Sequence, residues 1–170
     1  MGVVYAGRMT YRNIKNHYVL IGFNELSINM IRELYDECPS ARILLMSGME
    51  SATVRHRIQS ALPVEVERQV LVYFGNIESI EELQRLNIES AIEVYVLGDE
   101  ERYGRDAKNI AIVHLVSTLR GKCYDGKMMP VYVQFDSIPS YSNIQKMNLP
   151  PEVFCIEGKP NTVSYTHLRA

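Results

Sequence analysis

The feature that most constrains the fold is a series of short apolar runs that recur along the chain. Each run is near-continuous rather than alternating, which is typical of strands buried on both faces of a sheet. We predict six strands, at Tyr18–Ile21, Ile43–Met46, Val70–Phe74, Val94–Leu97, Val131–Phe135 and Val153–Ile156. Because helical segments alternate with these runs, the pattern predicts an α/β fold with a parallel sheet, right-handed crossovers and helices on both faces.

Segments between the runs repeat apolar residues at helical spacing. A fourth such segment, Asp106–Arg120, differs because apolar residues occupy most of its circumference. One side of this helix should pack on the sheet, and the other side needs a second partner. The three earlier helices carry Leu26, Met30, Leu34 and Cys38; then Val54, Ile58, Ala61 and Leu62; then Ile80, Leu83 and Leu86.

Composition excludes several classes of function. The 170 residues suit one domain, and 18 basic against 20 acidic residues leave a net charge of -2, so nucleic acid is not an expected partner. Cys38, Cys123 and Cys155 are odd in number and far apart, which argues against a disulfide framework or a metal site. No apolar run approaches the roughly 18 to 20 residues of a membrane span. We therefore expect a cytoplasmic, soluble domain.

The stretch "NHYVLIGFNELSINMIRELYDE", Asn16–Glu37, joins a strand to a helix through a tight glycine turn. A dinucleotide-binding turn has three glycines, and here only Gly22 remains, with Asn24 and Ser27 at the other two positions. Tight binding of a pyrophosphate is therefore weakened as a hypothesis. Two alternatives stay open: the start of the helix holds a single phosphate or carboxylate, or Asn24 caps the helix and Glu25 complements its dipole.

The ends of the next strands offer further polar residues. NAD-binding domains place an acid after the second strand, where this chain has Ser47. The run 55–57, Arg-His-Arg, is either a phosphate contact or a solvated helix face. Asn76 follows the third strand, and "GDEE" at 98–101 follows the fourth, where it forms either a cation site or a set of solvated loop charges.

We expect these positions to line a crevice at the carboxyl edge of the sheet. No catalytic signature is present: the chain has no G-x-S-x-G, no Walker loop and no H-E-x-x-H, and His114 lies within the apolar fourth helix. The candidate cofactor-binding residues are Gly22, Phe23, Asn24, Glu25, Leu26, Ser47, Asn76, Gly98 and Asp99.

The order of these motifs resembles the RCK family, also called KTN or Trk-type nucleotide-binding domains, which regulate potassium channels and transporters. The resemblance covers Arg12 to Gly158 and rests on "NHYVLIGFNELS", "VYFGNIESIEELQRLNIESAIEVYVLGDE", "DAKNIAIVHLVSTLR" and "VYVQFDSIPSYSNIQKMNL". It implies a six-stranded Rossmann-like three-layer domain, a homo-oligomer assembled through the Asp106–Arg120 helix, and a ligand crevice whose occupancy gates a pore. Without a full glycine fingerprint, the chain is most similar to divergent channel-gating members.

The resemblance implies that residues 1–15 are a connector from a membrane pore and that residues 16–158 are the domain. Periodicity ends after Gly158-Lys159-Pro160 and the last residues, "VSYTHLRA", continue no element, so we expect residues 159–170 to be a tail foreign to the native protein. The domain would lie at the inner membrane face, as a non-enzymatic ligand-sensing partner of a potassium channel or transporter. NAD(H) and adenine nucleotides are the candidate ligands. The alternatives are a small NAD(P)-dependent oxidoreductase and a structural pairing domain that binds nothing.

Overall fold

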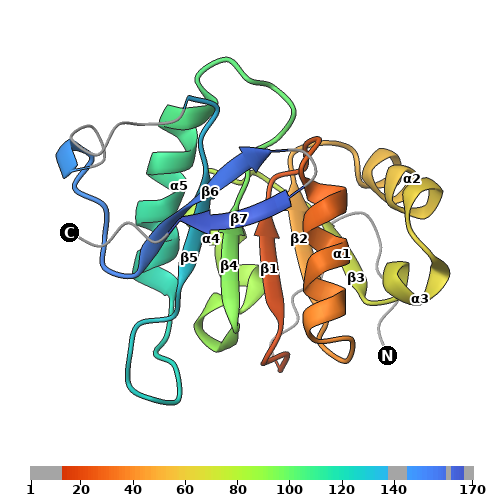
Figure 1. Cartoon of the computed structure of the whole chain (residues 1–170), viewed down its shortest axis with the longest axis horizontal. Helices are drawn as coiled ribbons and strands as arrows, with labels where there is room; N and C mark the ends of the chain where they lie inside the picture. Colours follow the sequence, from red (N-terminus) through yellow and green to blue (C-terminus); the bar gives the residue numbers. More distant parts are fainter. Residues whose placement is uncertain (1–12, 138–144, 160–161, 167–170) are drawn as a thin grey trace.

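A computed structural model of the chain describes residues 13–137, 145–159 and 162–166 (Figure 1). The predicted connector over residues 1–15 lies largely outside this part of the chain, as do residues 160–161 and 167–170 of the predicted tail. The first six strands form a parallel sheet in the order β3-β2-β1-β4-β5-β6, which confirms the predicted Rossmann-like α/β fold. Their bounds are β1 Tyr18–Ile21, β2 Ile43–Ser47, β3 Val70–Phe74, β4 Glu93–Val96, β5 Val131–Gln134 and β6 Val153–Lys159.

Helices cover both faces of the sheet, so the molecule has the three predicted layers. On one face α1 (Ser27–Glu37), α2 (Ser51–Ala61) and α3 (Val64–Glu67) contribute to a core centred on Leu20 and Leu45. On the other face α4 (Ile80–Leu83), two short 3-10 turns (Gln84–Leu86 and Ile88–Ser90) and α5 (Arg105–Leu119) pack over Val19 and Val96.

The α5 helix begins and ends one residue earlier than the predicted Asp106–Arg120 helix. Its inner side is buried on the sheet through Ile112, Val113 and Val116. The Ala111 and His114 side chains are exposed on its outer side. The helix therefore has one packed side and one open side, as its apolar circumference predicts.

A seventh strand corrects the expectation that the carboxyl-terminal segment continues no element. β7 (Thr162–Thr166) pairs antiparallel with β6, with Cys155 opposite Thr166 and Lys159 opposite Thr162. Backbone hydrogen bonding at a sheet edge needs no apolar pattern, so the loss of periodicity in this segment did not exclude a strand. The foreign origin of residues 159–170 stays a prediction.

Candidate functional site

The candidate site lies at the carboxyl edge of the sheet, where β1 lies between β2 and β4. The chain runs from β1 outward to β2 and β3, then returns to β4 on the other side. Open parallel sheets bind ligands at such a reversal of strand order. The turn after β1 and the loop after β4 therefore meet at the place where a ligand crevice is expected.

Two glycines allow these two segments to approach each other. Gly22 has φ +98°, and a Cβ built on it would lie 2.2 Å from the carbonyl carbon of Gly98. Gly98 itself has φ +81° and donates its N–H to the carbonyl oxygen of Ile21 at 3.0 Å. The retained glycine of the turn is thus required by contact between two backbones of the chain.

The Asp99 carboxylate ties three segments of the edge together. Its Oδ1 accepts hydrogen bonds from the Phe23 N–H at 2.9 Å and from the Ser47 hydroxyl at 2.6 Å. Its Oδ2 accepts one from the Gly48 N–H at 2.9 Å. The sequence predicts Asp99 at this edge as one of several loop acids, and it carries no signal for these contacts.

The residues that replace the second and third glycines are both buried. The Asn24 side chain is fully buried; its Nδ2 donates to the carbonyl oxygens of Leu97 and Gly98 and to Gln134 Oε1, at 3.1, 2.9 and 3.1 Å. Its Oδ1 accepts the Leu26 N–H at 2.9 Å. This last bond resembles the cap predicted for Asn24, although α1 itself begins at Ser27.

The buried Ser27 hydroxyl stabilises the turn with a hydrogen bond. It accepts the Asn24 N–H at 2.9 Å. In a dinucleotide-binding turn the second glycine lets the backbone approach the pyrophosphate and the third allows close packing of helix and strand. These two positions carry side chains here, and both side chains are buried in hydrogen bonds within the chain.

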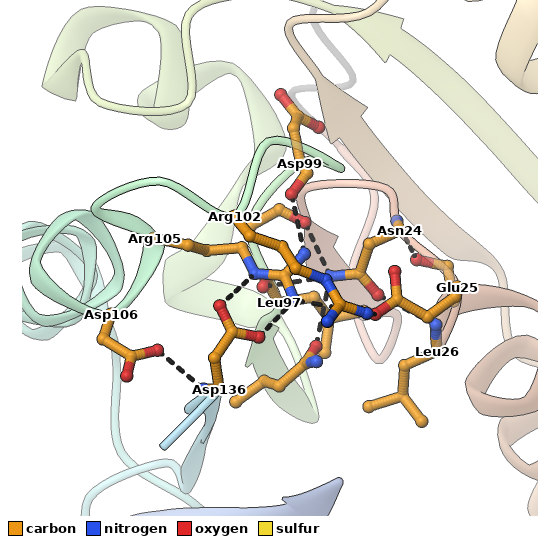
Figure 2. A network of polar contacts seen from close by, with 12 residues as sticks. Asn24, Glu25, Leu26, Leu97, Asp99, Arg102, Arg105, Asp106 and Asp136 are labelled. Atoms are coloured by element: carbon orange, nitrogen blue, oxygen red, sulfur yellow. Dashed lines mark hydrogen bonds and ion pairs between the residues drawn. The ribbon is translucent and has the colours of Figure 1, made fainter. Parts of the chain in front are cut away.

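A charged network joins the turn to α5 (Figure 2). Arg105, only 2% exposed, donates Nε to Asp136 Oδ2 at 3.1 Å, pairs through its second amino group with Asp136 Oδ1, and donates to the Asp99 carbonyl oxygen at 3.0 Å. Glu25, which is exposed, lies 2.8 Å from Arg102 and 3.7 Å from Arg105. Partial burial alone would raise the pKa of Glu25, but its own backbone N–H and the two arginine charges outweigh that effect and lower it.

The first turns of α5 also hold the ends of β4 and β5. Asp106 accepts the backbone N–H groups of Asp136 and Ser137 at 2.7 and 3.2 Å. Fully buried Asn109 donates to the carbonyl oxygens of Leu97 and Gln134, at 3.0 and 2.9 Å. The start of α5 is therefore fixed to two strand ends by side chains that periodicity analysis treated as ordinary helix positions.

The basic run on α2 meets protein groups. The Arg57 guanidinium lies 5.0 Å from the centre of the buried Phe23 ring and pairs with Glu100. Arg55 lies 3.8 Å from Glu67. The phosphate contact considered for this run is therefore not favoured. The alternative, a solvated helix face, does not describe Arg57 fully either, because its side chain contacts Phe23 and Glu100.

A pocket of about 240 Å³ opens beside the start of α5. Three of the nine predicted site residues line it: Asn76, Gly98 and Asp99. The other six, which are the five residues Gly22–Leu26 and Ser47, are not among its lining residues. Its charged lining has both signs and includes Glu78, Glu101 and Lys108. The other lining residues are Gly48, Ile77, Arg105 and Asn109.

Two features are absent from the described residues. Among them no group of three or more His, Cys, Asp or Glu side chains is arranged to hold a metal ion, so the cation site considered for residues 98–101 is not favoured. Within the same ranges no helix combines the length and apolar composition needed to cross a bilayer.

Solved structures with the same fold include the GsuK channel, its RCK domain and a TrkA-N domain. The GsuK channel bound to NAD matches 88% of this chain at 13% identity with a TM-score of 0.60, and the GsuK RCK domain matches 89% at 13% identity and 0.60. The TrkA-N domain of the inner membrane protein ybaL from Escherichia coli matches 83% at 16% identity and 0.53, over 87% of its own length. GsuK bound to ADP also matches, with a TM-score of 0.57 at 13% identity over 88% of this chain and 33% of that one.

The chain spans 23% and 28% of the first two GsuK chains. No family model and no curated protein matches the sequence. At these identities the likeness concerns the fold, and it agrees with the strand order found here. The chain is therefore an RCK/TrkA-N-like domain in fold.

Proposed function

We propose that this chain is a regulatory domain of a potassium channel or transporter, which associates with a second copy through α5 and faces its ligand at the carboxyl edge of the sheet. The observation that carries the proposal is that α5 is bonded to the sheet edge at its start and leaves an outer side exposed. Arg105, the first residue of α5, is bonded to the Asp99 carbonyl oxygen and to Asp136 at the sheet edge. The same helix leaves Ala111 and His114 exposed on its outer side.

The centre of the outer side of α5 carries small or uncharged side chains, with exposed Lys108 beside them. Exposed Ala107, Ala111, His114 and Thr118 follow one another at helical spacing, beside the half-buried Leu115. Small and apolar side chains allow a second helix to approach closely, while charged side chains on an exposed helix usually prevent it. A domain whose edge and outer helix are mechanically joined can convert ligand binding into a change of packing, and this needs no chemical step.

Association can be tested with one charge. Wild-type protein is expected to sediment above the 19.5 kDa of the monomer at concentrations around 100 μM. Ala111→Glu places a charge at the centre of the outer side and should shift the mass toward the monomer. Ala52→Glu, on exposed α2, is the matched control and should sediment as wild type. A wild type that stays monomeric throughout this range would contradict pairing through α5.

The channel or transporter assignment is tested by the DNA that flanks the reading frame. We expect pore-forming or transporter helices to be encoded next to this domain. A flanking substrate domain of a dehydrogenase would instead support the oxidoreductase alternative. For that alternative the chain would also have to oxidise a supplied alcohol with NAD(P), which a regulatory domain would not do.

A further inference from the structure

The Gly22 turn already holds an anion, and that anion belongs to the chain. The Asp99 carboxylate accepts the Phe23 N–H, the first after Gly22, and the Gly48 N–H that follows β2, both at 2.9 Å. The Ser47 hydroxyl adds a third donor at 2.6 Å. In Figure 2 the Asp99 backbone faces Arg105 and its carboxylate points away from the charged network. Converging backbone N–H groups and a hydroxyl are the kind of donors that bind a phosphate in proteins.

Three other N–H groups of the turn, those of Gly22, Asn24 and Leu26, are occupied as well. The Gly22 N–H donates to the Met46 carbonyl oxygen at 2.7 Å, and the Asn24 N–H donates to the Ser27 hydroxyl at 2.9 Å. The Leu26 N–H donates to Asn24 Oδ1 at 2.9 Å. A helix start normally offers such donors to a ligand because they lack intrahelical partners. In this turn, the three N–H groups donate instead to two side chains and to a carbonyl oxygen of the neighbouring strand β2.

Charge opposes a second anion at the same place. A phosphate that approached Phe23 and Gly48 would meet the Asp99 carboxylate at hydrogen-bonding distance from both N–H groups. Glu25 adds another negative charge in the turn, and Arg102 and Arg105 are already paired with it. Like charges at contact distance repel strongly where water is partly excluded.

We propose that Asp99 determines ligand specificity: its carboxylate takes the place of a ligand's phosphate, so the Gly22 turn rejects pyrophosphate-bearing nucleotides such as ADP and NAD. This deepens the proposed function, because it concerns the ligand class of the same crevice. It also separates this chain from the GsuK channel, whose solved structures include NAD-bound and ADP-bound forms. Ligands of the domain are then molecules without a diphosphate at this turn.

The test compares nucleotide binding before and after the carboxylate is removed. Isothermal titration calorimetry with ADP and with NAD should give no measurable binding to wild type up to about 1 mM, and at least about tenfold tighter binding to Asp99→Ala. Glu50→Gln, which removes an exposed acid from the loop after β2, is the control and should behave as wild type. Micromolar binding of either nucleotide to wild type would overturn the proposal, and so would a folded Asp99→Ala that binds neither nucleotide more tightly than wild type does.

A second measurement needs no variant, in case Asp99→Ala does not fold. Amide nitrogen–proton NMR spectra of wild type should show the Phe23 and Gly48 resonances unmoved by added ADP. Displacement of both resonances at micromolar ADP would show that the nucleotide replaces Asp99 and would refute exclusion. Neither result changes the sedimentation experiment, so failure of this inference is distinguishable from failure of pairing through α5.

Discussion

Replacing Gly22 by alanine tests whether the contact between the ends of β1 and β4 holds the edge of the sheet together. Gly22 lies at φ +98°, and the added methyl carbon would fall 2.2 to 2.4 Å from three backbone atoms of Gly98. Backbone atoms cannot rotate away as the end of a flexible side chain can. The two strand ends must therefore separate, or the turn must change conformation.

Two costs add in this substitution. A non-glycine residue in the left-handed region loses about 1–2 kcal/mol. Forcing a carbon into packed backbone costs about 1–3 kcal/mol more, as other overpacked sites do. The expected loss is about 2–5 kcal/mol, a large part of the roughly 5–15 kcal/mol by which a domain is stable.

Urea unfolding followed by far-ultraviolet circular dichroism measures the loss. With a slope of about 2 kcal/mol per M, the midpoint should fall by about 1–2.5 M. Gly126→Ala is the matched control, because Gly126 also has positive φ, +84°, but a Cβ there meets nothing within 4 Å. It should lose only the conformational part, about 1–2 kcal/mol. Equal losses in the two variants would refute the steric argument.

Two further predictions concern buried polar groups. Burial lowers the pKa of His17 below its ordinary 6.5, although its Nε2 lies 2.9 Å from the Leu86 carbonyl oxygen. Below pH 6.5 the unfolded chain binds a proton at His17 that the folded chain does not bind. The free energy of unfolding should therefore fall as the pH drops from 6.5 toward the pKa of His17 in the folded chain. Urea midpoints measured across about pH 5 to 8 should show this slope, and His17→Gln should flatten it. Asp136→Ala leaves Arg105, 2% exposed, without its main partner and should destabilise by about 2–4 kcal/mol, whereas exposed Glu25→Gln should cost less than about 1 kcal/mol in the same assay. Similar losses for the two variants would contradict the central role given to the Arg105–Asp136 pair.

The strands and most helices follow from the sequence because they depend on local apolar patterns. Each of the six predicted strands overlaps an observed one, and the bounds differ by three residues at most. The start of α4 is also local in origin, because the hydroxyl of its N-terminal neighbour Ser79 accepts the Glu82 N–H at 3.4 Å. A strand that is buried on both faces needs apolar side chains at nearly every position. Its location can therefore be predicted from a few consecutive residues.

The site was less predictable because its contacts join residues far apart in the chain. The Asp99 carboxylate meets Phe23, Ser47 and Gly48 only after β1, β2 and β4 have aligned. Nothing near Arg105 in the sequence indicates that Asp136, 31 residues later, will pair with it. The one available signal was the pair of glycines at the ends of two adjacent strands, which indicates a close approach.

The first residue of α5 is bonded to Asp99 in the loop after β4, and from this connection we predict that the two proposed surfaces of the domain are thermodynamically linked. If a solute at the strand ends tightens the association of two copies by some factor, association must tighten the uptake of that solute by the same factor. Pairing constants measured with and without a candidate solute would thus report its affinity difference between single and paired domains.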